Sequence, residues 1–242
     1  MLPILQVGPL ALPLPPLLIL IAFWLGANLS ERRAPRHGIQ ANLVGDLLFY
    51  GLIAGILAAR LGYALRFPSA FIDSPASLIS TNLDLFDIWG GLAGALIFGL
   101  AYALRKEMAL WPTLDAITPF LAAMALGIPL ANLAAGSAYG LPAELPWAIE
   151  LWGQARHPVQ VYEALAAALI LWAVMRTSAA RRIPGDLFLN FVMLSAAALL
   201  LLGAFRAEGS LLPNGWRTIQ VLAWFVAAGA WQLLRTGVLQ RR

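Results

Sequence analysis

The chain has 242 residues, of which 61% are hydrophobic and 12% are charged, and its mean hydropathy is +0.78. Soluble domains carry about a quarter of their residues as charges, so this composition excludes a soluble globular protein and indicates an integral membrane protein. The formal net charge of +4 does not indicate nucleic-acid binding, because the basic residues lie in short loops between apolar segments. With no cysteine, the chain has no disulfide, thiolate metal site or cysteine nucleophile of its own.

Apolar segments long enough to cross about 30 Å of hydrocarbon follow one another along the chain. We expect an all-α integral membrane protein, a bundle of seven transmembrane helices in a single domain that covers residues 1–242. The expected helices are 10–29, 43–65, 86–104, 114–135, 159–175, 187–205 and 219–234. A segment at about 66–85 is expected to lie on the membrane surface. A loop at about 136–156 is expected to cover a site on the outer face as a lid does.

The distribution of basic residues predicts how the bundle is oriented. Eleven of the sixteen Lys and Arg residues follow the first, third, fifth and seventh segments, four lie on the opposite side, and Arg60 lies inside the second segment. Cytoplasmic loops carry an excess of Lys and Arg, so the N-terminus is expected outside and the C-terminus in the cytoplasm. No basic residue precedes the first segment, so we expect it to stay as an anchor.

Prolines interrupt the start of the first segment. Pro13, Pro15 and Pro16 lack an N–H donor, and their rings clash with the carbonyl one turn back. Either a kinked start or a helix that begins at Pro16 fits this pattern.

Polar groups stand near the predicted outer ends of several segments, where they are expected to act on a polar molecule. Arg60 either forms an anion site or extends toward the lipid headgroups. Asn132 follows Pro129 in the fourth segment, and it either lines an opening of the helix or bridges two helices. Arg206, at the level of Arg60, would give a phosphate in the outer leaflet two forked donors.

The fifth segment begins with a polar run, the sequence RHPVQVYE at residues 156–163. His157, Gln160 and Glu163 follow at intervals of three residues and share one side of a helix, whereas Tyr162 points elsewhere. A neutral imidazole takes up a proton near neutral pH. His157 is therefore either a general base or a structural residue, and the sequence leaves both open.

These motifs, taken in order, resemble those of the prolipoprotein diacylglyceryl transferase family. The run at 156–163 is similar to the family motif HPSQLYE, and the sequence RLGY at 60–63 is similar to its RxGY motif. The glycines at 90–94 match its glycine-rich third helix, and Asp115 matches an aspartate in its fourth. Asn132 and the stretch 136–140 fall where the family has its GRxGNF signature and the glycine motif after it.

The resemblance implies a bacterial inner-membrane enzyme that transfers the diacylglyceryl group of phosphatidylglycerol to the lipobox cysteine of a lipoprotein precursor. Its implied partners are the phospholipid and the precursor's signal peptide, without nucleic acid, cofactor or metal. His157 is implied as the catalytic base, and Arg206 as a catalytic phosphate clamp together with Arg60. The implied substrate-binding residues are Arg60, Tyr63, Asn132, Gly136, Gly140, Gln160, Tyr162 and Glu163. We expect Arg60, Asn132, His157 and Arg206 to meet at one lipid-sized cavity that opens to the outer leaflet.

The chain departs from the family pattern at positions on which the family relies for chemistry. Trp89 stands in place of a histidine, Ile128 of an arginine and Ser137 of a glutamate. A second function therefore stays open, that of a relative that binds lipid or lipoprotein without turnover. A transporter or channel is disfavoured, because the last three segments carry no continuous polar stripe and no inverted repeat is visible.

Overall fold

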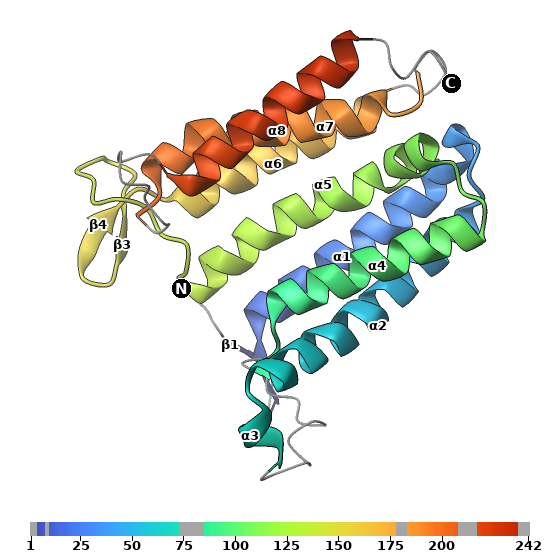
Figure 1. The fold of residues 1–242 in the computed structure, drawn as a ribbon. Coiled ribbons are helices and arrows are strands. Elements are labelled where there is room, and N and C mark those ends of the chain that lie inside the picture. Colours follow the sequence, from blue (N-terminus) through green and yellow to red (C-terminus); the bar gives the residue numbers. More distant parts are fainter. Residues whose placement is uncertain (1–3, 8–9, 73–84, 178–182, 208–216, 237–242) are drawn as a thin grey trace.

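The computed structural model describes residues 4–7, 10–72, 85–177, 183–207 and 217–236. Long helices that alternate in direction form a bundle, with two small hairpins at one end (Figure 1). The long helices are α1 (Leu14–Arg33), α2 (Ala41–Arg66), α4 (Ile88–Arg105), α5 (Leu110–Ala135), α6 (Val159–Arg176), α7 (Asp186–Leu202) and α8 (Thr218–Arg235). The short elements are β1 (Ile4–Val7), β2 (Leu10–Pro13), η1 (Ala34–His37), α3 (Pro68–Ile72), β3 (Ile149–Leu151), β4 (Gln154–Arg156) and η5 (Gly203–Phe205). We call the end with the hairpins β1–β2 and β3–β4 the hairpin end, and the end with η1 the turn end.

Six of the described helices are long and apolar enough to cross a membrane. They cover Leu14–His37, Ala41–Arg66, Ile88–Arg105, Leu110–Ala135, Val159–Arg176 and Asp186–Phe205. Helix α8 has a similar length, but two tryptophans, two glutamines and an arginine lower its hydropathy. The seventh span and the predicted orientation of the termini therefore stay predictions. Of the segment expected on the membrane surface, residues 73–84 lie outside the described residues.

The first helix does not begin where the sequence predicted. Residues 10–13, which were expected to begin the helix, form strand β2 instead. This strand pairs antiparallel with β1, with Val7 opposite Leu10. Helix α1 starts at Leu14, between the two expected starts at 10 and 16. The prolines at 15 and 16 fit within its first turn, where backbone N–H groups have no partner inside the helix in any case.

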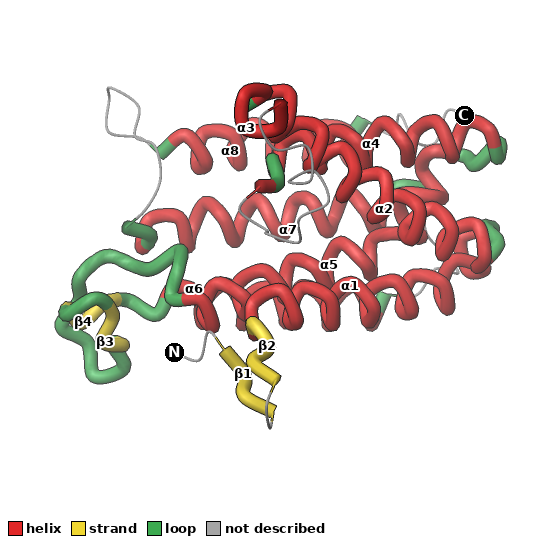
Figure 2. The backbone as a smooth tube through the Cα atoms, turned by 90° about the horizontal axis from the view of Figure 1, so that it is seen from below, coloured by secondary structure: helices red, strands yellow, loops and turns green. Residues whose placement is uncertain are grey.

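Helix α5 lies in the middle of the bundle. It packs against α1 on one side and against α6 and α7 on the other (Figures 1 and 2). Helices α2 and α4 form a pair on the α1 side, and α7 and α8 form a pair beyond α6. Half of the residues in the most apolar stretch of α5 are buried, whereas α4 contains no buried residue. The centre of the protein is therefore α5, and α4 lies at one flank.

Small residues bring the paired helices close together. A Cβ on Gly94 of α4 would overlap the Cβ of Ala58 in α2, and a Cβ on Gly91 would lie 3.2 Å from the carbonyl oxygen of Gly55. Such contacts are typical of membrane helices, which associate through packing because lipid is as apolar as their side chains. The glycine-rich start of α4 therefore serves helix packing.

Candidate functional site

The loop after α5 forms the middle of a backbone ladder at the hairpin end. Residues 139–143 pair antiparallel with residues 205–207 on one side and with residues 155–157 on the other. The Leu141 amide donates to the carbonyl of Phe205 at 2.8 Å. This ladder places the start of α6 and the end of α7 next to the same loop, although they are far apart in the sequence.

The same loop is fixed where it leaves α5. Gly136 ends the helix in the left-handed region, at φ 73°, which glycine adopts without strain. The hydroxyl of Ser137 donates to Oδ1 of Asn132 at 3.3 Å, and the Ser137 carbonyl accepts from Nε2 of Gln160 at 2.8 Å. The Gln160 side chain is fully buried. Asn132 and Gln160 thus hold the turn from two helices.

His157 lies directly against Gly140. A Cβ on Gly140 would lie 2.7 Å from the Cβ of His157 and 2.8 Å from Cγ2 of Val159, so only glycine fits between them. The imidazole packs on Phe205, with ring centroids 5.1 Å apart, and on Tyr162 at 6.3 Å. Its Nδ1 is buried and has no hydrogen-bond partner among the described residues. This nitrogen is therefore available to a proton or to a bound group.

Arg206 and Glu163 form an ion pair across the end of the ladder. Nε of Arg206 lies 2.8 Å from Oε1 of Glu163, and Nη2 donates a hydrogen bond to Oε2 at 3.1 Å. The side chains are 28% and 14% exposed, so the pair is partly shielded from water. Within the described part of the chain, Nη1 of Arg206 makes no hydrogen bond and remains free for another oxygen.

Two residues of this region were not among the predicted site residues. Arg156 lies over the ring of Tyr139, 4.7 Å from its centroid, and donates to the carbonyls of Gly140 and Leu151 at 3.3 and 3.2 Å. Trp147 donates through Nε1 to the hydroxyl of Tyr162 at 2.8 Å. The position of Arg156 immediately before the HPVQVYE motif was the available signal, whereas nothing in the sequence pairs Trp147 with Tyr162.

The structure therefore brings most of the predicted site residues together. We call the residues Asn132, Gly136, Gly140, His157, Gln160, Tyr162, Glu163 and Arg206 the His157 cluster.

Arg60 and Tyr63 lie apart from this cluster. Arg60 is 7% exposed and donates to the carbonyl of Leu85 at 3.0 Å, and its guanidinium lies 5.0 Å from the ring centroid of Phe86. Tyr63 packs on Phe67, with centroids 4.9 Å apart. Both residues are on α2, whose main neighbours are α4 and α1. In the described part of the chain no hydrogen bond or ion pair joins Arg60 to Arg206 or to His157, and the two-arginine clamp stays a prediction.

The substituted family positions face outward. Trp89 on α4 is 74% exposed and Ile128 on α5 is 48% exposed, which suits apolar side chains that face lipid. Ser137 lies within the turn described above, where it contacts Asn132 and Gln160. Among the described residues no three His, Asp or Glu side chains lie close enough to hold a metal ion.

Fold and site together define a polytopic α-helical membrane protein with a cluster of polar side chains at one end of its bundle. A model of the prolipoprotein diacylglyceryl transferase family matches residues 3–235. The chain belongs to this family.

Several relatives carry the name phosphatidylglycerol–prolipoprotein diacylglyceryl transferase. The protein of Azoarcus sp. (strain BH72) is 33% identical over 187 residues, which cover 74% of this chain and 71% of the relative. That of Aromatoleum aromaticum is 32% identical over 188 residues, with the same shares. That of Pseudoalteromonas translucida is 30% identical over 179 residues, 72% of this chain and 67% of the relative.

Proposed function

We propose that this protein transfers the diacylglyceryl group of phosphatidylglycerol to the lipobox cysteine of a lipoprotein precursor. The observation that carries the proposal is the family match over residues 3–235, together with the assembly of the 157–163 motif and Arg206 into one cluster. The names of the relatives support phosphatidylglycerol and prolipoprotein as substrates.

The reaction exchanges one bond at a glycerol carbon. The sulfur of the precursor's cysteine, as thiolate, attacks the glycerol carbon that bears the phosphate, and a carbon–sulfur bond forms while the carbon–oxygen bond breaks. The phosphate leaves on the glycerol headgroup as glycerol phosphate, and the thiol proton goes to a base. The protein must therefore accept a proton and stabilise the negative charge of the leaving phosphate.

Arg206 is the group that we assign to the phosphate. Glu163 contacts Nε and Nη2 and thereby orients the guanidinium, which leaves Nη1 without a hydrogen-bond partner among the described residues and able to donate to a phosphate oxygen. A charged donor in a site shielded from water stabilises developing charge far more strongly than it would in bulk solvent. Arg206 is therefore the proposed clamp, and a contribution from Arg60 stays a prediction.

His157 is the group that we assign to the thiol proton. Its buried Nδ1 has no partner among the described residues, and the rings of Phe205 and Tyr162 hold the imidazole in place. Gln160, Asn132 and the turn 136–140 position this residue, because they fix the loop against which it packs.

We further propose that the hairpin end faces the outside of the bacterial inner membrane and that α8 is the seventh span of one domain. Seven of the twelve described basic residues lie at the turn end, and the positive-inside rule assigns the more basic side to the cytoplasm. They are Arg32, Arg33, Arg36, Arg105, Lys106, Arg176 and Arg235. In this orientation the His157 cluster lies on the outer side, where the signal peptide of an exported precursor presents its cysteine. Arg60 and Tyr63 lie near the same end on α2, and their predicted contact with substrate stays a prediction.

The test is a transfer assay with purified protein, labelled phosphatidylglycerol and a lipobox peptide. Turnover is expected in the wild type, and Arg206→Ala is expected to reduce it by about a hundredfold or more, as removal of one oxyanion donor does. His157→Ala should reduce turnover less at high pH, where the peptide thiol ionises without a base. Arg66→Ala is the control, since Arg66 is an exposed arginine on α2 that stacks on Phe67. Wild-type protein that binds the lipid without any transfer would instead support the binding function.

A further inference from the structure

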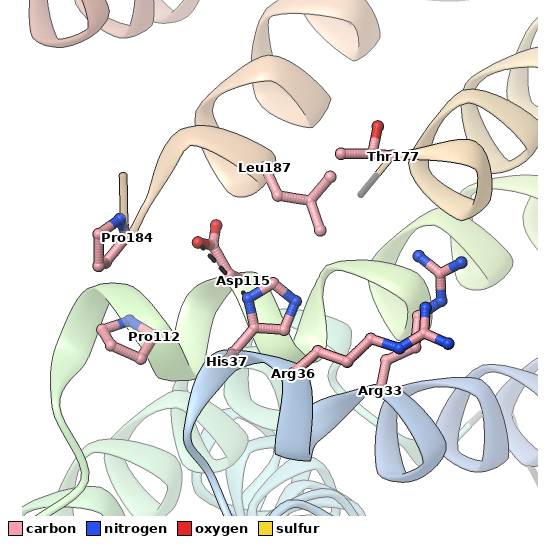
Figure 3. A pocket seen from close by; sticks show the side chains of 8 residues that line it. All are labelled: Arg33, Arg36, His37, Pro112, Asp115, Thr177, Pro184 and Leu187. Carbon is pink, nitrogen blue, oxygen red and sulfur yellow. Dashed lines mark ion pairs between the residues drawn. The ribbon is translucent and has the colours of Figure 1, made fainter. Parts of the chain in front are cut away.

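A second group of basic side chains meets at a cavity at the turn end. The cavity has a volume of about 150 Å³ and is lined by side chains from the end of α1 and η1, from α5, and from the segments that border α6 and α7. Arg33, Arg36 and His37 lie along one side of it, and the carboxylate of Asp115 lies beside the His37 ring (Figure 3). None of these residues belongs to the His157 cluster.

Arg33 lines the cavity and also holds the end of a neighbouring helix. Its guanidinium donates to the carbonyl of Val174 at 3.0 Å and also to that of Met175, in the last turn of α6. These carbonyls lack partners inside the helix, so the contact caps α6 and fixes the guanidinium at the cavity wall.

Both carboxylate oxygens of Asp115 accept hydrogen bonds from the start of α7. Its side chain is almost completely buried, Oδ2 accepts from the amide of Gly185 at 2.7 Å, and Oδ1 accepts from that of Phe188 at 2.8 Å. These two amides open α7, so the carboxylate caps that helix. Oδ2 also lies 3.9 Å from Nδ1 of His37. Asp115 forms no ion pair with Arg33 or Arg36, and its single negative charge offsets only one of their two positive charges.

The side chain of Arg36 makes no hydrogen bond or ion pair with any residue that the structure describes. Its side chain reaches along the cavity toward the guanidinium of Arg33, so two positive charges lie on the same side (Figure 3). Like charges repel unless an anion lies between them or water screens them. The cavity thus has an excess of positive charge and one forked donor without a partner among the described residues.

We propose that this cavity binds a phosphate group at the membrane surface, with Arg36 as its main ligand and Arg33 and His37 beside it. A planar guanidinium matches the oxygens of phosphate in geometry and charge. The cavity has the volume of about five water molecules, which suits a phosphate group. The phosphate belongs either to the headgroup of a lipid or to a small soluble anion, and the acyl chains of a lipid would remain outside the cavity.

The experiment measures binding of two probes to the full-length protein in a phosphate-free detergent solution by calorimetry. The probes are inorganic phosphate and a water-soluble, short-chain phosphatidic acid. All variants carry Arg206→Ala in addition, so that a lipid at the His157 cluster does not contribute. Arg36→Ala is compared with Arg32→Ala, because Arg32 is also exposed at the end of α1 but does not line the cavity.

Binding of at least one probe is expected, with a loss of about tenfold or more in affinity for Arg36→Ala and none for Arg32→Ala. Stronger binding of the short-chain lipid would assign a headgroup, and equal binding of both probes would assign a soluble phosphate. The proposal is overturned if neither probe binds, or if Arg36→Ala and Arg32→Ala change the affinity equally. Because the two sites share no residue, this result is independent of the transfer assay.

Discussion

At the scale of single residues, the pair of Arg206 and Glu163 contributes to stability as well as to the proposed chemistry. Removing Arg206 leaves a partly buried carboxylate without its counter-ion, so Arg206→Ala is expected to lower the free energy of unfolding by about 1 to 2 kcal/mol. Because Glu163→Ala removes the same contact, the double variant should lose less than the sum of the single variants. Unfolding in a detergent titration measures all three, and strictly additive losses would contradict the coupling.

Gly140 sets the distance between the central loop and α6. Gly140→Ala would push its Cβ into His157 and Val159, and overpacking of this kind costs about 1 to 3 kcal/mol. Gly229→Ala on α8 is the control, because a Cβ there meets no other atom within 4 Å and alanine favours a helix. We expect a lower unfolding temperature for the first variant and an equal or higher one for the second. Equal changes would show that the close contact does not matter.

At the scale of whole elements, helix α4 depends on α2 for its position. It contains no buried residue, and its glycine face lies against the alanines of α2. Gly94→Ala is therefore expected to move α4 outward and to speed protease cleavage of the exposed connection around residue 107. Gly99→Ala serves as the control, because its Cβ would lie at an ordinary 3.7 Å from Leu47. Limited proteolysis in detergent compares the two, and identical cleavage rates would contradict the dependence.

At the scale of the whole molecule, the orientation of the bundle has a direct test. The chain contains no cysteine, so a single introduced cysteine is the only thiol that a maleimide can label. Glu144 lies in the loop near the hairpin end and Glu107 between α4 and α5, and both are exposed. An impermeant maleimide added to spheroplasts is expected to label Glu144→Cys and not Glu107→Cys. Permeabilised cells, in which both should react, control for accessibility, and the reverse pattern would invert the proposed topology.

Hydropathy predicted most of the bundle, because the length of an apolar run directly reflects the thickness of hydrocarbon that it must cross. The prediction was wrong at the start of the first helix. Prolines 15 and 16 are compatible with a first turn as well as with a break, and the sequence does not distinguish the two. The hydropathy of α8 is lowered by its tryptophans and glutamines, so the seventh span rests on the charge pattern and on the length of the helix.

For the site, the spacing of residues predicted which side chains share a helix, but not which side chains from other segments contact them. The spacing of His157, Gln160 and Glu163 placed them on one helix, yet their partners come from the turn after α5 and from the end of α7. Those partners depend on a backbone ladder between segments far apart in the chain, which no local pattern encodes. Arg60 was predicted as an anion site or a headgroup contact near the outer end of its helix, and its contacts include the carbonyl of Leu85 and the rings of Phe86 and Phe71, which no local pattern in the sequence predicts.

The central place of α5 affects how the protein can be made. Helices insert into the bilayer in the order of their synthesis, so α1 (Leu14–Arg33) is inserted before α5 (Leu110–Ala135) has emerged from the ribosome. The face of α1 that later packs against α5 therefore contacts lipid first. That face is built from Ala22, Gly26 and Ser30, and only Ser30 carries a polar group there, which finally accepts from the Phe120 amide at 2.9 Å. Until then a serine hydroxyl can bond to the carbonyl one turn back in its own helix. This face of α1 can therefore contact lipid without an unsatisfied polar group until α5 is inserted.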